Sequence, residues 1–200
     1  MEIRYALKRF TEVARSEILR DHIRASCVAA TWISIEVFRR LGFQAAPLEV
    51  KASVGNGAYG RRVVTGQRPT SIEQLLRWGT EDGSYVVGIG KQGILGGLGG
   101  HLVALVEATY LVDSSLDQAA STANDLKVPS VVVIQLQPSE LASGVVRRVD
   151  PDLFIEYVVS PVAAEYTNSP DWGMTTEVKE TVDCILSRMG MLVAKDPSRT

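Results

Sequence analysis

The sequence predicts one α+β domain over residues 1–200, in which helices at both ends of the chain flank an antiparallel sheet. Three observations lead to this class. Apolar residues recur at helical spacing over the first 41 positions and again over 176–193. Several short apolar segments between positions 46 and 159 have the composition of strands. These segments follow one another closely instead of alternating regularly with helices, which favours α+β over a parallel α/β sheet.

The N-terminal region predicts two helices. Residues 3–20 form an amphipathic pattern, with apolar positions separated by Arg, Lys and Glu. Residues 27–41, CVAATWISIEVFRRL, carry no charge before Glu36, which is typical of a buried helix. Ser26 is a candidate N-cap for this helix, and Gly42 is a candidate for the residue that ends it.

The middle of the chain predicts mostly strands and loops. A third helix is expected at 69–79, with Ser71 or Thr70 as its cap and Gly79 as its end. Residues 154–159 are compatible with a strand or a helix end. Strands are expected at 46–54, 84–90, in the hairpin 99–115, at 130–137 and at 144–149, with the last two paired; loops are expected at 55–60 and 91–100.

The composition excludes several classes of protein. The net charge is −2, with 22% charged residues, so no general attraction to nucleic acid or a membrane surface is expected. No apolar run is long enough to span a bilayer, and the charged N-terminus lacks the apolar centre of a signal peptide. The two cysteines, 157 positions apart, indicate neither a disulfide framework nor a metal motif. A cytoplasmic protein without a metal or cofactor is therefore predicted.

One set of glycines has the spacing of a dinucleotide-binding motif. Gly88, Gly90 and Gly93 have G-x-G-x-x-G spacing after a predicted strand. The third glycine of such a site must begin a helix, but four more glycines follow before position 101, which disfavours one. The glycine-rich run is instead interpreted as either a flexible flap or a plain connection.

The hairpin GGHLVALVEATYLVDSS, residues 99–115, places His101 at the start of one strand and Asp113 at the end of the next. A two-residue turn at 108–109 would put their side chains on opposite faces of the hairpin. A three-residue turn at 107–109 would pair Val103 with Asp113 and make Asp113 the diagonal neighbour of His101. A functional His–Asp pair therefore requires the three-residue turn.

An aspartate hydrogen-bonded to one nitrogen of an imidazole leaves the other nitrogen to exchange a proton with a nucleophile. Cys27 is the candidate nucleophile, because the first turn of a helix lowers the pKa of a thiol. Its backbone N–H is also a candidate donor to an oxyanion. Each residue has an ordinary alternative: a buried core cysteine, a half-exposed histidine and a turn-capping aspartate. Cys184 is interpreted as structural, and His22, next to Asp21, is a rival base.

The sequences SCVAATWISIEVFRRLGF, GHLVALVE and YLVDSSLDQA resemble the transglutaminase-like branch of the papain-like cysteine superfamily, in which Cys, His and Asp follow in this order. Arylamine N-acetyltransferases are a further branch with the same order. The resemblance covers about a quarter of the chain. It implies a helix with an N-terminal Cys27 packed on an antiparallel sheet and facing His101 and Asp113.

The implied chemistry is acyl transfer through a thioester, as amide hydrolysis, deamidation or transamidation. The substrate would be a peptide, protein or small molecule that carries an amide or acyl group. Papain-like peptidases have an oxyanion glutamine shortly before the cysteine, and this chain has Asp21 and His22 there. The alternative is a papain-like domain that has kept the geometry for binding and does not catalyse. The sequence predicts no oligomeric state.

Overall fold

The computed structural model describes residues 1–21, 27–89, 98–160 and 165–191. Within these ranges the chain forms six α-helices and a seven-stranded antiparallel sheet, which confirms the predicted α+β class. No helix in the described ranges is both long enough and apolar enough to cross a membrane. The helices are α1 (Ile3–Asp21), α2 (Cys27–Arg40), α3 (Gly57–Val64), α4 (Ile72–Asp82), α5 (Pro138–Ser143) and α6 (Thr176–Arg188). The strands are β1 (Ala45–Asn56), β2 (Val86–Ile89), β3 (Leu98–Val106), β4 (Tyr110–Asp113), β5 (Val132–Gln135), β6 (Val145–Val149) and β7 (Leu153–Val159).

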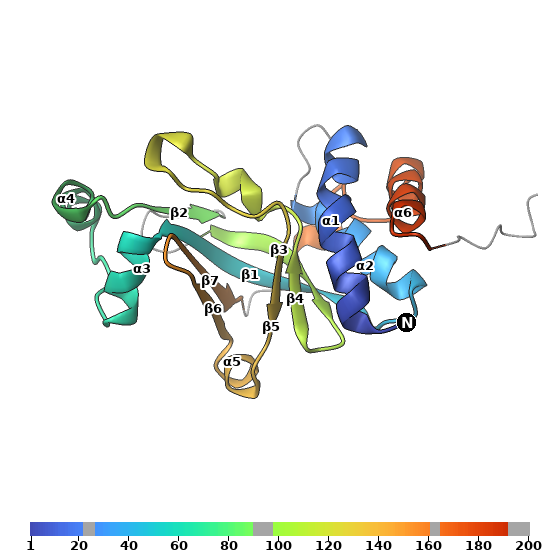
Figure 1. The fold of residues 1–200 in the computed structure, drawn as a ribbon, viewed down its shortest axis with the longest axis horizontal. Coiled ribbons are helices and arrows are strands. Elements are labelled where there is room, and N and C mark those ends of the chain that lie inside the picture. The colour runs from blue at the N-terminus through green and yellow to red at the C-terminus, as the bar shows by residue number, and fades with distance from the viewer. Residues whose placement is uncertain (22–26, 90–97, 161–164, 192–200) are drawn as a thin grey trace, which may run out of the picture.

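The sheet is built around the long strand β1. The strand order is β5-β4-β3-β1-β7-β6, and β2 pairs with the end of β1 that lies beyond β3. The sheet curves until it is nearly closed. Helices α1, α2 and α6 gather at one end of the molecule, whereas α3 and α4 lie at the opposite end (Figure 1). The buried helix α2 packs against β3, α6 and β1.

Strands β3 and β4 are apolar on both faces because each face covers a different core. Ala104, Val106 and Val112 face the core shared with α1, α2 and α6. Val103 and Leu111 face the core on the other side of the sheet, together with residues of β1 and β7. His101 is two positions from Val103, and Asp113 is two positions from Leu111. Because residues two positions apart in a strand share a face, both polar side chains belong to this second face.

Two predicted helix ends are confirmed. Gly42 ends α2 with a φ of 89°, and the N–H groups of Gly42 and Phe43 donate to Arg39 and Phe38 at 2.9 and 3.0 Å. This is the pattern of a glycine-terminated helix. The side chain of Ser71 caps α4 by accepting a hydrogen bond from the Gln74 N–H at 3.2 Å.

Two predictions for residues 55–83 are wrong. Much of the predicted loop at 55–60 belongs to α3, because the Asn56 side chain accepts the Tyr59 N–H and starts a helix despite the neighbouring glycines. Gly79 does not end the next helix. It remains helical inside α4, and Gly83 takes the left-handed conformation, with a φ of 73°, that ends it.

The predicted pairing of 144–149 with 130–137 is also wrong. Strand β6 pairs with β7, and β5 pairs with β4. The short helix α5 lies between β5 and β6, so these two strands do not form a hairpin. Residues 154–159, which the sequence left open, lie within strand β7.

Candidate active site

The β3–β4 hairpin has the three-residue turn that a His–Asp pair requires. Val106 pairs with Tyr110, which leaves residues 107–109 in the turn. Glu107 and Ala108 adopt left-handed conformations, with φ of 52° and 48°. The turn is held by Glu107, whose carboxylate accepts the Gln44 N–H and whose own N–H donates to the Gln44 carbonyl, at 2.6 and 2.8 Å. The register prediction is therefore confirmed.

This register brings the side chains of His101 and Asp113 into contact. The His101 Nε2 lies 2.6 Å from the Asp113 Oδ2, and each residue is only 1% exposed. Because an ionised carboxylate has no proton to give, the imidazole N–H is the donor. A contact so short and so well shielded from water is typical of a charge-assisted hydrogen bond.

Asp113 accepts three further hydrogen bonds. Its Oδ1 accepts from the backbone N–H and the hydroxyl of Ser115, at 2.9 and 3.2 Å. Its Oδ2, which already binds His101, also accepts from the Tyr157 hydroxyl at 3.0 Å. The carboxylate is thus well compensated for its burial, which a buried charge requires.

The pair favours the ionised form of both residues. Burial alone would lower the pKa of His101, but the charge and the hydrogen bond of Asp113, with a smaller contribution from Cys27, outweigh burial and raise this pKa to about 10. Burial alone would raise the pKa of Asp113, but the imidazolium and the donors from His101, Ser115 and Tyr157 lower it. At neutral pH the two side chains therefore form an imidazolium–carboxylate pair.

An irregularity in β3 lies directly before His101. Val50 of β1 pairs with His101, but Ala52 pairs with Leu98, so β3 contains one extra residue at this point. The extra length is taken up next to Gly100, which has a φ of 105°. Such bulges redirect the neighbouring side chain, and they are frequent beside active sites.

The bulge also brings Gly100 to the first residue of α2. The Cys27 thiol donates to the Gly100 carbonyl, with a sulfur–oxygen distance of 3.7 Å. Cys27 is half-buried, so this residue is less deeply buried than His101 and Asp113. The candidate nucleophile, base and orienting carboxylate are thus contributed by the start of α2, by β3 and by the end of β4.

The surroundings lower the pKa of the Cys27 thiol. Burial raises this pKa and the Asp113 charge opposes the thiolate, but the nearby His101 with its positive charge and the Leu102 N–H together have the larger effect. The Nδ1 of His101 is buried and makes no hydrogen bond of good geometry to a described residue. Since Nε2 is occupied by Asp113, Nδ1 is the nitrogen available to the thiol.

A row of buried hydroxyls fixes α2 against the hairpin. The Thr31 hydroxyl donates to the Leu102 carbonyl at 2.7 Å. The hydroxyls of Ser34 and Ser114 lie 2.9 Å apart, and the Ser114 hydroxyl also lies 3.2 Å from the Ala30 carbonyl. Ser114 follows Asp113 directly, so these bonds hold the carboxylate and the cysteine helix in one arrangement.

Sequence reasoning did not identify four of these supporting residues: Thr31, Ser34, Ser115 and Tyr157. A signal for the first two was present, since they are hydroxyl residues three positions apart in an otherwise apolar segment that follows Cys27. Ser115 is close to Asp113 in sequence, where a side-chain bond to the backbone two residues on is common. Tyr157 is 44 positions away, and no local pattern connects it to Asp113.

The remaining sequence candidates lie elsewhere. Cys184 is half-buried in α6, where the Arg20 guanidinium contacts its sulfur at 3.5 Å. His22, the rival base, and Ser26, the candidate cap, fall outside the described residues. So do Gly90 and Gly93 of the dinucleotide-like motif, whose first glycine, Gly88, lies in β2.

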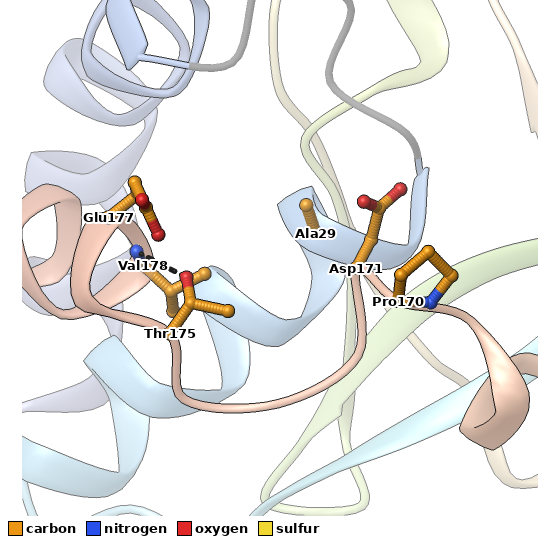
Figure 2. Close-up of a pocket in the computed structure, with 6 residues that line it drawn as sticks. All are labelled: Ala29, Pro170, Asp171, Thr175, Glu177 and Val178. Atoms are coloured by element: carbon orange, nitrogen blue, oxygen red, sulfur yellow. Dashed lines mark hydrogen bonds between the residues drawn. The ribbon is translucent and has the colours of Figure 1, made fainter.

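A small hollow of about 180 Å³ lies beside the first turn of α2. Figure 2 shows Ala29 of α2 between two groups of residues: Thr175, Glu177 and Val178 at the start of α6 on one side, and Pro170 and Asp171 on the other. Cys27, His101 and Asp113 do not line it. We therefore do not assign it to the reaction.

No protein-family model, curated protein or solved structure matches this chain. Among the described residues, no group of three or more His, Cys, Asp and Glu side chains is arranged to hold a metal ion. The function must therefore be argued from the site.

A substitution at Gly100 tests whether the β3 bulge builds the site. Alanine at a φ of 105° is strained, although no atom lies within 4 Å of the added Cβ. We expect Gly100→Ala to cost about 1–2 kcal/mol of unfolding free energy and to slow alkylation of Cys27 about tenfold, since the bulge aims His101.

Gly42→Ala is the matched control, because Gly42 also has a positive φ, 89°, with no atom within 4 Å of its Cβ. It lies at the far end of α2. We expect a similar loss of stability, measured by urea unfolding, with unchanged alkylation. Equal alkylation rates in the two variants would contradict a role of the bulge in the site.

Proposed function

We propose that this protein is an enzyme of the papain-like, transglutaminase-like class that transfers an acyl group through a thioester on Cys27. The observation that carries the proposal is the buried contact of 2.6 Å between His101 Nε2 and Asp113 Oδ2. The other imidazole nitrogen is left for a thiol at a helix N-terminus whose pKa is lowered. A nucleophile, a base and a group that orients the base are the parts this chemistry needs.

Each residue has a distinct role in the proposed reaction. The Cys27 thiolate attacks the carbonyl carbon of an amide, and the Cys27 backbone N–H stabilises the oxyanion. His101 then gives the proton on Nδ1 to the departing amine while the carbon–nitrogen bond breaks. The neutral imidazole next removes a proton from water or an amine, which attacks the thioester and releases the thiolate. Asp113 keeps the ring oriented and stabilises the imidazolium throughout.

Burial supports the same division of roles. His101 and Asp113 are each 1% exposed, whereas Cys27 is half-buried. A substrate could therefore reach the sulfur while the ion pair behind it stays dry, and electrostatic effects are stronger in such surroundings. The proposed substrates are peptides, proteins or small molecules that carry an amide or acyl group.

Alkylation of the native protein with iodoacetamide between pH 4 and pH 10 tests the proposal. Mass spectrometry would assign each adduct to Cys27 or Cys184, so Cys184 serves as the internal reference. We expect Cys27 to react rapidly at pH 6, well below the free-thiol pKa of about 8.5. An ordinary thiol profile for Cys27 would contradict the proposal and favour a binding domain with an unused triad.

A further inference from the structure

Tyr157 reaches the site from a part of the chain that is distant in sequence. It lies in β7, on the other side of β1 from the hairpin, and it is completely buried. Its ring packs in the core that the sheet encloses, and its hydroxyl donates to the Asp113 Oδ2 at 3.0 Å. This oxygen is the one that binds His101.

We infer that Tyr157 is a positioning residue, which holds Asp113 ionised and aimed at His101 by donating to the oxygen that receives the imidazole N–H. The catalytic part of this inference rests on the proposed function. The two carboxylate oxygens are then held differently. Ser115 anchors Oδ1 from within the hairpin, whereas Tyr157 fixes Oδ2 from the opposite part of the sheet.

The chemistry of the contact makes Tyr157 a constant donor. Burial and the Asp113 charge raise the pKa of Tyr157 well above its ordinary value, so the phenol keeps its proton over the working pH range. The charged groups around it are Asp113 of β4, His101 behind Asp113, and Arg148 of β6, which also bonds Asp150 at 2.7 Å. Only the ionised form of Asp113 offers Oδ2 as a full acceptor to both donors.

Loss of this hydroxyl should affect Cys27 only through Asp113. Tyr157→Phe keeps the ring and removes one hydrogen bond to a charged group, an interaction that changes an equilibrium or a rate about tenfold or more. Tyr59→Phe is the matched control. Tyr59 is also buried, but its ring packs edge-on against Phe154, in the separate cluster near α3 and α4.

The test is a double-mutant cycle on the rate of Cys27 alkylation at pH 7. We expect Tyr157→Phe to slow alkylation about tenfold in the wild-type background, and by less than about twofold in the Asp113→Asn background, because the carboxylate is then absent. Tyr59→Phe should leave the rate unchanged. Equal slowing in both backgrounds, which a general packing defect would cause, would overturn the inference, as would an unchanged rate in Tyr157→Phe alone.

Unfolding in urea separates failure of this inference from failure of the proposed function. If wild-type Cys27 reacts as an ordinary thiol, the proposed function fails and the catalytic part of the inference fails with it. The coupling between Tyr157 and Asp113 is then still tested by the unfolding free energies of the variants. We expect Tyr157→Phe to lose less unfolding free energy in the Asp113→Asn background than in the wild-type background, whereas Tyr59→Phe should lose the same amount in both. An equal loss for Tyr157→Phe in the two backgrounds would overturn the coupling.

Discussion

The His101→Ala variant is expected to lose the activated thiol, so that Cys27 is alkylated at pH 6 no faster than an ordinary cysteine. Any amide turnover should fall by about 10⁴-fold or more, because removing the base of such a site costs nearly as much as removing the whole triad. The reason is that the positively charged imidazole beside the thiol lowers the pKa of Cys27. The measurement is the pH profile of alkylation, resolved for Cys27 and Cys184.

Burial makes this substitution costly for stability as well. His101 and Asp113 are both 1% exposed, so truncating the imidazole leaves a buried carboxylate that has lost its cation. Breaking a buried pair in this way costs about 3–5 kcal/mol. The His101→Ala variant is therefore expected to be much less stable than the wild type.

His101→Gln is therefore the companion variant, since its amide N–H can still donate to Asp113 but cannot act as a base. Thermal unfolding with near-ultraviolet circular dichroism would show that it is folded. A folded His101→Gln protein that retains rapid alkylation of Cys27 at pH 6 would contradict the assignment of His101 as the base.

The sequence analysis chose the three central residues because each stands at the boundary of a predicted element. In the structure Cys27 begins α2 and Asp113 ends β4, whereas His101 lies inside β3, which begins at Leu98. Apolar alternation could not choose between a two-residue and a three-residue turn, because the strands are apolar on both faces. The requirement that His101 and Asp113 meet selected the longer turn, and the pairing of Val106 with Tyr110 agrees.

Features that depend on distant contacts could not be read from local patterns. The glycine-rich run predicts a loop up to position 100, yet residues 98–100 continue β3 and form the bulge opposite β1. Strand β6 pairs with β7 because both continue the sheet beyond β1, and nothing in their spacing distinguishes this from pairing with β5. Tyr157 contacts Asp113 only because the curved sheet brings β7 and β4 around one core.

The Asp113→Asn variant is expected to reduce turnover about 10²–10⁴-fold. Asparagine keeps the size of the side chain but removes the charge that raises the pKa of His101. Burial then has the larger effect on the imidazole and favours its neutral form. Moreover, an amide has an NH₂ group in place of one carboxylate oxygen, so the donors on that side, either Ser115 at Oδ1 or Tyr157 at Oδ2, lose their acceptor.

The same variant should change how stability depends on pH. In the wild type, the raised pKa of His101 gives a stabilisation that is complete below the unfolded pKa of about 6.5 and is lost as the pH rises toward about 10. The lowered pKa of Asp113 gives a stabilisation that is present above about pH 3.9, its unfolded pKa, and is lost as the pH falls further. Both contributions are therefore complete between about pH 4 and 6.5.

Urea unfolding of both proteins at pH 6, 8 and 9.5 measures this difference directly. We expect Asp113→Asn to be less stable than the wild type by about 3–5 kcal/mol at pH 6. The gap should narrow steadily toward pH 9.5, because the unfolded His101 loses its proton above about pH 6.5 whereas the folded wild type still holds it. A gap that stays constant with pH would mean that His101 is not held as an imidazolium by Asp113. In that case the short contact would be a neutral hydrogen bond, and the thiol at the start of α2 would have no buried cation to activate it.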